Sequence, residues 1–470
     1  MTIATGGTLG TGISSTSSSS FTLATATNTL ASGDFGILVV VTDNRSNFSG
    51  SYDHTGVSGG TGGWLKLDEY TYTAGVAGDG VAVSVWLFEA TGTVSTGTTI
   101  TITLSGTATD KAATFWKFTK AAGKGIRLSP HANGTPIRNT TVGSNGFGSV
   151  SFASLSSLSR LYLRGLGKEA NIGTTGFTAS TNFTAMTMIR SRNNASAVGA
   201  LGEFRINTST GETSNPTLAI AGDTAGIFLA LEEYTPGTDI SWDFEVSTAT
   251  CFTDTAGTTA VTSDGDLVAA IKDKNTGRII ETQATSTDRP IYKTGGGKPY
   301  LDMTSKSFNG MSNVAHQCME AATGRMSIGV AVNFDSNTGT QEVIHATNGT
   351  MAWQGPRNTT GSVNMLLPGF SDTGPSITAA QGTVLSALCN TTALEAFVDG
   401  TGNGSSSRTQ GVNINNGIIL NPFAGKLYGF KIYPGLIDST THTAMVSALQ
   451  ALYTAAGGST GPWLYATILE

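Results

Sequence analysis

The residues that could do chemistry are few and far apart. Asp243 and Glu245 place two carboxylates at alternate positions of a strand-like segment, a spacing at which an acid and a nucleophile can face one cleft in a glycan-cleaving enzyme. Ser247 stands where a third carboxylate would continue the pattern. We interpret the pair as a solvated strand edge next to Trp242, with a catalytic pair as the less favoured alternative.

Other reactive patterns are incomplete. No Gly-x-Ser-x-Gly elbow in a strand-to-helix setting accompanies any histidine, and His442 is expected at the surface of a helix. The Gly-rich run before Trp64 lacks the Lys-Ser/Thr of a phosphate loop. Asp335 opens an Asp-x-Asn segment, but Ala346 stands where a calcium loop needs its bidentate Glu. We expect a turn there, with a weak calcium site as the alternative, and no cofactor.

Sugar binding needs aromatic faces that stack on sugar rings and polar side chains that bind hydroxyls. Two segments that look like loops have this composition. The residues expected to contact glycans are Trp64, Tyr70 and Tyr72 in the first, and Trp353, Gln354 and Arg357 in the second. Trp353 is the expected anchor, at a loop tip before a Gly-Pro turn. The alternative is that Trp353 caps a hydrophobic core.

Composition limits the classes of protein that can position such residues. Glycine numbers 61 of 470 residues, charged residues are 12% and hydrophobic residues 39%. A chain so poor in charge does not suit helical bundles, and a β-rich, turn-rich protein with a neutral polar surface remains. The net charge is -6 without any long Lys/Arg cluster, so a nucleic-acid partner is not expected. The three cysteines suit neither a disulfide framework nor a zinc site.

The N-terminus has no basic signal region, and its longest nearby apolar run, Ile37 to Val41, is too short for a signal sequence or a membrane span. A β-rich chain without an export signal, disulfides or many charges suits a phage virion protein assembled in the host cytoplasm. The same apolar run predicts a strand covered on both faces.

The pattern of strands and turns predicts an all-β fold of two antiparallel β-sandwich (jelly-roll-like) domains with one short C-terminal helix. Residues 1–20 are expected to form a flexible or attachment arm, 21–235 a first sandwich and 239–470 a second, with the boundary at Pro236-Gly237. The helix is expected to begin at Ser439 or Thr440 and to end before Gly457. The other strand-like runs cover 81–88, 99–104, 113–118, 161–163, 183–189, 227–231, 278–280, 326–334, 342–344, 383–385, 394–398 and 426–433.

The second half resembles a concanavalin A-like (laminin G-like) jelly-roll domain. The resemblance lies in a strand at 425–433 followed by a helix, and in a hairpin at 396–401 that carries Val-Asp-Gly. Further landmarks in the same order are 273–277, 283–285, 289–290 and 297–301, while Ile271 stands where the family usually has Trp. The first half resembles, on fewer residues, a β-sandwich module of phage virion proteins.

Together these features predict a tailed-phage structural protein, a tail fibre, spike or head fibre, that binds host-surface glycans and is not an enzyme. Other virion proteins, a second copy of the chain and a host-surface polysaccharide are the expected partners, without membrane insertion. The alternatives are an architectural capsid decoration protein without a ligand, and a polysaccharide depolymerase. A secreted bacterial adhesin is disfavoured because no signal peptide is present.

Overall fold

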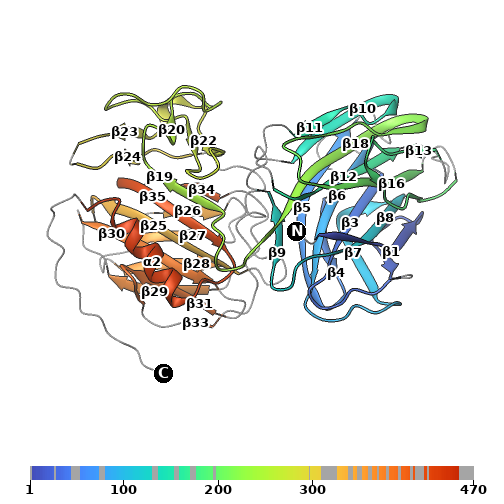
Figure 1. The fold of residues 1–470 in the computed structure, drawn as a ribbon, viewed down its shortest axis with the longest axis horizontal. Helices are drawn as coiled ribbons and strands as arrows, with labels where there is room; N and C mark the ends of the chain where they lie inside the picture. The colour runs from blue at the N-terminus through green and yellow to red at the C-terminus, as the bar shows by residue number, and fades with distance from the viewer. Residues whose placement is uncertain are drawn as a thin grey trace.

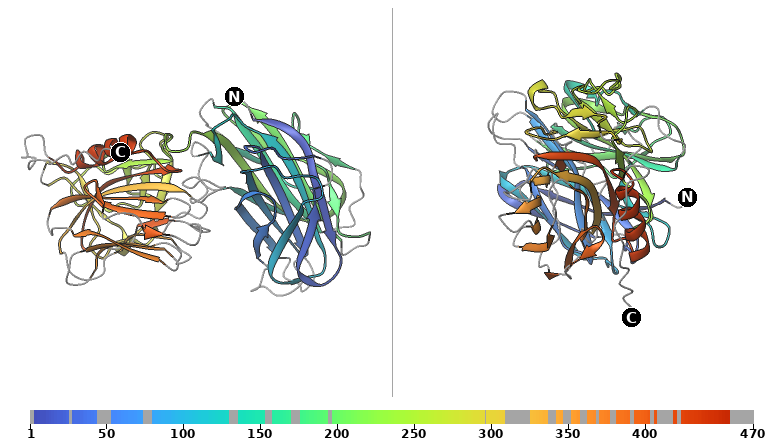
Figure 2. Two further views of the ribbon diagram at one scale, coloured as in Figure 1. Left: turned by 90° about the horizontal axis from the view of Figure 1, so that it is seen from below. Right: turned by 90° about the vertical axis from the view of Figure 1, so that its left-hand side faces the viewer.

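The computed structural model describes most of the chain. The described residues are 3–25, 28–43, 53–73, 80–129, 136–152, 158–169, 176–193, 197–295, 297–308, 325–336, 342–346, 352–357, 362–367, 370–376, 381–389, 393–402, 406–407, 418–420 and 423–454. Among these residues every strand pair is antiparallel. Strands up to β18 gather in one lobe, and strands from β19 form a second (Figures 1 and 2). The predicted all-β class with one short C-terminal helix is confirmed.

A central sheet organises the first lobe. Its strand order is β1 (Ala4–Ser14), β8 (Lys111–Thr119), β3 (Phe35–Asp43), β6 (Gly80–Ala90) and β5 (Gly62–Thr73). Every residue of β3 and β6 is buried. Ile37 and Val39 belong to one hydrophobic core, whereas Leu38 and Val40 belong to another. Because successive side chains of a strand point to opposite faces, the continuous apolar run is explained by cores on both sides of this sheet, as predicted.

An outer sheet covers one face of the central sheet. It consists of β2 (Ser18–Ala24), β7 (Thr99–Ala108) and β4 (His54–Ser58), in that order. Its alternate residues Phe21, Ile100 and Ile102 are buried in the core shared with Leu38 and Val40, and the residues between them are mostly exposed. This alternation is the expected pattern for a sheet with one face in the core and one in water.

A back sheet covers the other face. Its main path is β10 (Ile137–Gly146), β18 (Thr217–Tyr234), β12 (Arg160–Glu169), β16 (Val198–Asn207) and β14 (Thr184–Ala185), with β9 (Gly125–Leu128), β13 (Phe177–Thr178) and β15 (Ile189–Arg190) attached. A short pair, β11 (Val150–Phe152) and β17 (Glu212–Ser214), lies apart from this path. Residues 183–189 were predicted as one strand, but β14 and β15 are separate two-residue strands there.

The two faces of β12 differ in kind. Gly165 allows close contact with the central sheet, because a Cβ on it would lie 2.5 Å from Val85 Cγ2. On the opposite face, Arg160, Arg164 and Lys168 are fully buried. Arg164 and Lys168 donate to backbone carbonyls of the segments that cover this face; Lys168 Nζ, for example, donates to Ser144 O at 2.7 Å. Arg160 Nε donates instead to Ser129 Oγ at 2.9 Å. Buried cations therefore hold a covering layer on the back sheet, and nothing in the hydrophobic pattern predicted it.

The prediction of an arm over residues 1–20 is wrong. Residues 4–14 form β1, which pairs with β8, and β2 begins at Ser18. The glycines that indicated flexibility serve close packing instead, because a Cβ on Gly10 would lie 2.3 Å from Ala24 O. Lys111 Nζ donates to Thr16 O at 2.7 Å and so ties down the connection between the two strands.

The described residues of the second lobe form three sheets. The largest has the order β23 (Ile291–Lys293), β24 (Tyr300–Asp302), β35 (Gly425–Pro434), β25 (Met326–Phe334), β30 (Gly382–Cys389), β31 (Ala393–Val398) and β32 (Thr401–Gly402), with β19 (Trp242–Glu245) and β33 (Ser406–Ser407) attached. A second sheet runs β29 (Phe370–Ser376), β28 (Ser362–Leu367), β27 (Ala352–Arg357), β26 (Glu342–Ala346) and β34 (Ile418–Leu420). The third comprises β20 (Cys251–Phe252), β21 (Ala270–Lys272) and β22 (Ile279–Thr282), and a 3-10 turn, η1, spans Ser286–Asp288.

Helix α2 (Ser439–Gln450) packs Met445 and Leu449 on one face of the large sheet. Its N-cap is Asp438, whose carboxylate accepts a hydrogen bond from Thr441 N at 2.7 Å. The predicted cap at Ser439 or Thr440 is therefore wrong by one or two positions; Asp is an equally good cap because its carboxylate satisfies the same orphan donors. His442 is buried, not at the surface as predicted, and its Nε2 lies 2.8 Å from Ser386 Oγ.

The segment that connects the two lobes runs from the end of β18 at Tyr234 to the start of β19 at Trp242. Among the described strands, none before it pairs with one after it. The interval is itself hydrogen-bonded, since Gly237 N donates to Pro434 O at 3.2 Å and Arg127 Nη1 donates to Ser241 Oγ at 3.0 Å. The proposed boundary near Pro236 falls here, and the division into two domains stays a prediction, as does the concanavalin A-like assignment of the second.

Candidate functional site

Strand β5 carries three of the six residues predicted to contact glycans. Trp64, Tyr70 and Tyr72 were expected in a loop, but all three lie in β5 and pair with β6. The register shifts between Lys66 and Asp68, and such a bulge reverses which face later side chains use. Trp64 accordingly packs against the core under the outer sheet, whereas Tyr70 and Tyr72 pack against the core under the back sheet. The structure therefore separates Trp64 from the two tyrosines.

Trp64 is held from several sides. Its ring centroid lies 4.6 Å from that of Phe88 and 5.3 Å from that of Phe115. Its indole Nε1 donates to Gly59 O at 2.8 Å, across the turn between β4 and β5. The side chain is partly exposed, so Trp64 closes the margin of a core rather than standing free as a stacking surface.

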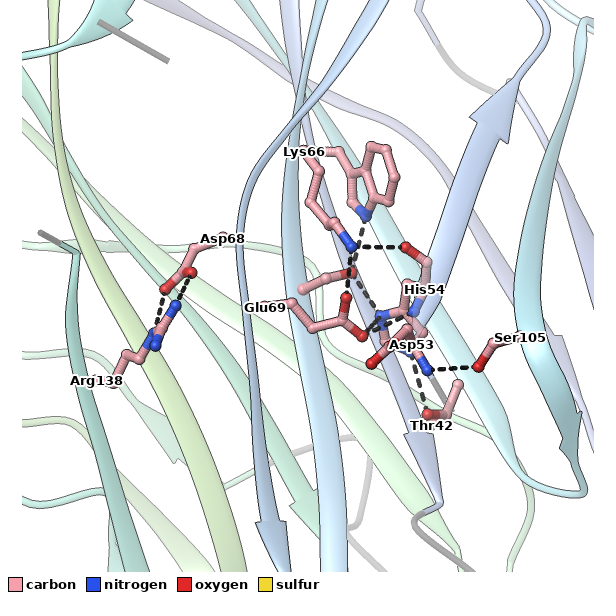
Figure 3. A network of polar contacts seen from close by, with 10 residues as sticks. Thr42, Asp53, His54, Lys66, Asp68, Glu69, Ser105 and Arg138 are labelled. Carbon is pink, nitrogen blue, oxygen red and sulfur yellow. Dashed lines mark hydrogen bonds and ion pairs between the residues drawn. The ribbon is translucent and has the colours of Figure 1, made fainter. Parts of the chain in front are cut away.

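Tyr70 lies with Arg138 and Asp68 where β5 approaches β10, and Tyr72 is two residues further along β5, near Asp223 of β18. Arg138 Nε donates to Asp68 Oδ2 at 2.8 Å, and Nη2 donates to the other carboxylate oxygen. The Arg138 guanidinium lies over the Tyr70 ring, 5.7 Å from its centroid, and the bond to Asp68 raises the pKa of Arg138. We call Tyr70, Tyr72, Arg138 and Asp68 the seam cluster; Figure 3 shows its ion pair.

Exposure at the seam cluster is uneven. The Arg138 side chain is 37% exposed whereas that of Asp68 is 1% exposed, and both tyrosines are partly exposed. Burial and the nearby Asp223 raise the pKa of Tyr72, so its hydroxyl stays protonated at neutral pH. The cluster thus offers aromatic surface, a phenol and a fixed guanidinium. Arg138 and Asp68 were missed by sequence reasoning; the available signal was that Arg138 is the one charged residue of the ten in β10.

A second polar group lies around the buried His54 (Figure 3). His54 Nδ1 lies 2.6 Å from Ser84 Oγ, and Nε2 lies 3.1 Å from Thr42 Oγ1. Glu69 accepts the His54 backbone N–H at 2.7 Å and comes within 3.7 Å of Nδ1. Lys66 Nζ donates to Glu69 at 2.7 Å and to His54 O at 3.0 Å. Burial lowers the pKa of His54, so the imidazole is neutral.

The His54 group has the residue types of a serine hydrolase but not its arrangement. In such a triad the serine and the carboxylate bind different imidazole nitrogens; here Ser84 and Glu69 both approach Nδ1. Ser84 is fully buried and also accepts a hydrogen bond from Trp86 Nε1 at 2.8 Å. A substrate therefore has no path to the hydroxyl in this conformation, and the group joins the central and outer sheets.

The carboxylate pair on β19 is engaged in ion pairs. Asp243 Oδ2 lies 2.6 Å from Lys431 Nζ on the neighbouring β35, and Glu245 Oε2 lies 2.6 Å from Lys274 Nζ. Asp243 is buried, and Trp242 beside it is 2% exposed. Asp243 thus stabilises the contact between β19 and β35, and only Glu245, whose side chain is 38% exposed, fits the predicted solvated edge.

The second predicted glycan cluster lies in β27. Trp353, Gln354 and Arg357 are strand residues, and Trp353 pairs with Ile344 of β26 and Met365 of β28. The predicted loop tip is therefore wrong, because two neighbouring strands flank this backbone. Their side chains lie outside the described part of the structure, so both the glycan contact and the alternative core role of Trp353 stay predictions.

Metal and membrane features can be judged only for the described residues. No group of three or more His, Cys, Asp or Glu side chains there could hold a metal ion, and no helix there is long and apolar enough to span a bilayer. Most of the candidate calcium segment after Asp335 lies outside the described residues. Cys251 and Cys389 are buried, and burial raises the pKa of Cys251 to about 12, which makes its thiol unreactive.

No family model and no curated protein matches the chain. Domain 4 of AbnA, a GH43 extracellular arabinanase from Geobacillus stearothermophilus solved with arabinotriose, is 13% identical over 44% of this chain and 98% of its own, with a TM-score of 0.30. The Ruminococcus gnavus IT-sialidase CBM40 bound to α2,3-sialyllactose is 12% identical over 27% and 82%, with a TM-score of 0.23. A structure reported on ganglioside-dependent cell entry of botulinum neurotoxin type C is 12% identical over 46% and 52%, with a TM-score of 0.30. Scores this low carry no argument about this chain.

Proposed function

We propose that this chain is a non-enzymatic structural protein of a bacteriophage virion, a tail fibre, spike or head fibre, that contacts host-surface glycans. The non-enzymatic part rests on the site geometry. The two acid–base arrangements among the described residues are used internally: Asp243 and Glu245 in ion pairs, and His54 with Ser84 in a buried group. The described residues therefore offer no accessible acid–base pair of the kind that a depolymerase reaction uses.

The glycan part is carried by one observation, the seam cluster. The Arg138 guanidinium is fixed by Asp68, lies over Tyr70 and remains 37% exposed. A guanidinium held in one orientation offers its remaining N–H donors to sugar hydroxyls at little entropic cost. The neighbouring Tyr72 supplies ring surface and a protonated hydroxyl. The charge on Arg138 is matched by Asp68, which favours an uncharged sugar.

The virion part rests on architecture and composition. The first lobe stacks three sheets, and charged residues make up only 12% of the chain. A large β-rich body with few charges suits a particle component that is assembled in the host cytoplasm beside other virion proteins and further copies of itself. The runner-up is an architectural protein without a ligand. The position of the Arg138 guanidinium over Tyr70 favours that alternative, because it covers one face of the ring on which a sugar would stack.

The glycan proposal is tested by binding of host-surface polysaccharide to variants Tyr72→Leu and Arg138→Gln. The matched control is Tyr300→Leu, which removes a partly exposed tyrosine under Lys426 at 4.9 Å in the second lobe. We expect at least a tenfold loss of affinity for the two seam variants, since anchor residues of an interface commonly contribute about 2 kcal/mol or more. Equal binding by all three variants and the native chain would refute the seam cluster as the site.

A further inference from the structure

The exposed face of the outer sheet presents an ordered set of hydroxyl groups. Thr22 of β2 pairs with Thr101 of β7, which pairs with Ser58 of β4. In the next row Ser20 pairs with Thr103. Residues directly opposite each other in an antiparallel sheet point to the same face, about 5 Å apart, and the next row on that face lies about 7 Å along the strand. The register therefore places these side chains in a two-row grid.

These hydroxyls are open to a ligand. Thr22, Thr103 and Ser58 are exposed and Thr101 is partly exposed. None of the four side chains forms a hydrogen bond within the described part of the chain. By contrast, the residues between them, such as Phe21 and Ile102, are buried in the core below. The inward-facing side chains of each strand thus anchor the sheet in the core, and the outward-facing side chains contact solvent.

The chemistry of this face is unusual in being neutral. The strands β2, β7 and β4 contain no Asp, Glu, Lys or Arg and no Trp or Tyr, and their one histidine, His54, points inward and is buried. Charged polymers such as nucleic acids or acidic glycans would find no counter-charge here. A hydroxyl group both donates and accepts hydrogen bonds, which is the property that sugar hydroxyls share.

The restricted side chains of the threonines also favour binding of a sugar polymer. Threonine is restricted about χ1 because it branches at Cβ, so a Thr grid on a packed sheet loses little rotamer entropy on binding. Single hydroxyl contacts gain little against water. A repeating polymer could engage several rows at once and gain through multivalency.

We infer that the outer sheet is a second glycan-binding surface, separate from the seam cluster, and that its ligand is a neutral, polyhydroxylated polysaccharide chain lying across Thr22, Thr101, Thr103 and Ser58. This inference deepens the proposed glycan contact and rests on it. The seam cluster lies on the back-sheet side of the central sheet, whereas the hydroxyl grid faces away from it on the outer-sheet side.

The test uses the full chain and measures binding to dextran, galactomannan and the anionic polymer alginate. The variant is Thr22→Val with Thr103→Val, which removes two hydroxyls and keeps the β-branched shape. The control is Thr184→Val, an exposed threonine on β14 of the back sheet. We expect the double variant to lose at least tenfold in affinity for a neutral polymer that the native chain binds, with its melting temperature unchanged and the control unaffected.

The outcomes separate the two sites. If Tyr72→Leu weakens binding and the double valine variant does not, the seam cluster stands and the hydroxyl grid is refuted. If the native chain prefers alginate, the neutral-ligand inference is wrong. If the native chain binds no host or test polysaccharide at all, the proposed glycan function fails and this inference fails with it. If the melting temperature of the valine variant falls, the double variant Thr22→Ser with Thr103→Ser is measured instead. It keeps both hydroxyls, so we expect it to bind like the native chain. Weak binding by this serine variant would contradict the inference.

Discussion

Replacing Arg164 with methionine should destabilise the first lobe by several kcal/mol. Its Nη2 donates to Phe147 O at 2.6 Å and to Asn139 Oδ1 at 2.7 Å. Its Nη1 donates to Gly148 O at 2.9 Å and to the carbonyl and hydroxyl oxygens of Ser214, both at 3.0 Å. One side chain therefore connects β12 to β10, to the segment after β10 and to β17.

The size of the effect follows from burial. Arg164 is fully buried, and although desolvation lowers its pKa to about 10, it remains a cation at neutral pH. Its removal takes a donor from the carbonyl oxygens of Phe147, Gly148 and Ser214. It also removes the cation near the buried Glu203. Removing one partner of a buried charged network typically costs about 3–5 kcal/mol. For a unit of this size that corresponds to a fall in melting temperature of roughly 10 °C.

Calorimetry of the full chain measures this change. The control is Arg205→Met on β16, whose side chain is 29% exposed and whose buried partner Glu212 keeps hydrogen bonds from Asn207 and Ser209. Because Glu212 retains these donors, we expect a smaller loss of stability for this variant. Arg164→Lys should recover part of the loss, since an ammonium has three donors where the guanidinium has five. A melting temperature for Arg164→Met within about 2 °C of the control would refute the reasoning.

The remaining predictions concern pH and domain structure. Burial lowers the pKa of His54 below the ordinary value of 6.5. The stability that the neutral imidazole contributes is therefore complete above pH 6.5 and is lost as the pH falls through the lower folded-state pKa. Urea midpoints measured from pH 6.5 downward should decline more steeply for the native chain than for His54→Gln. Burial raises the pKa of Glu281 well above its ordinary value of 4.5. The stability that the protonated carboxyl contributes is therefore complete below pH 4.5 and is lost as the pH rises through the folded-state pKa. Glu281→Gln should flatten the decline of the urea midpoint on the alkaline side. Residues 1–238, expressed alone, should give a cooperative melting transition because no described sheet crosses the interval between the lobes; a fragment without such a transition would contradict the two-domain prediction.

The sequence predicted elements best where one physical signal dominates. The apolar run in β3 indicated burial on both faces, residues 326–334 match β25, and the start of the helix was predicted within a residue or two. The end of the helix was predicted too late, because α2 ends at Gln450 and not just before Gly457. These segments have a clear period and a core on the expected side, so local pattern and tertiary packing agree.

Prediction failed where tertiary contacts decide. The sequence of β1 predicted an arm because it is rich in glycine, and glycine is common both in flexible segments and where sheets pack closely. The glycan clusters were read as loops because polar and Gly-rich strands such as β5 and β27 carry weak alternation. The seam cluster needed the pairing of Asp68 with a residue 70 positions away, and the hydroxyl grid needed the strand register; neither is visible in a linear pattern.

The central claim is that this protein binds glycan without cleaving it. Size-exclusion chromatography of the native chain mixed with purified host-surface polysaccharide, with light scattering on the eluate, reports both binding and polymer length in one run. The account predicts that the protein elutes with the polysaccharide and that the molar mass of the polysaccharide is unchanged after prolonged incubation. Separate elution would contradict glycan binding, and a falling molar mass would contradict the non-enzymatic assignment.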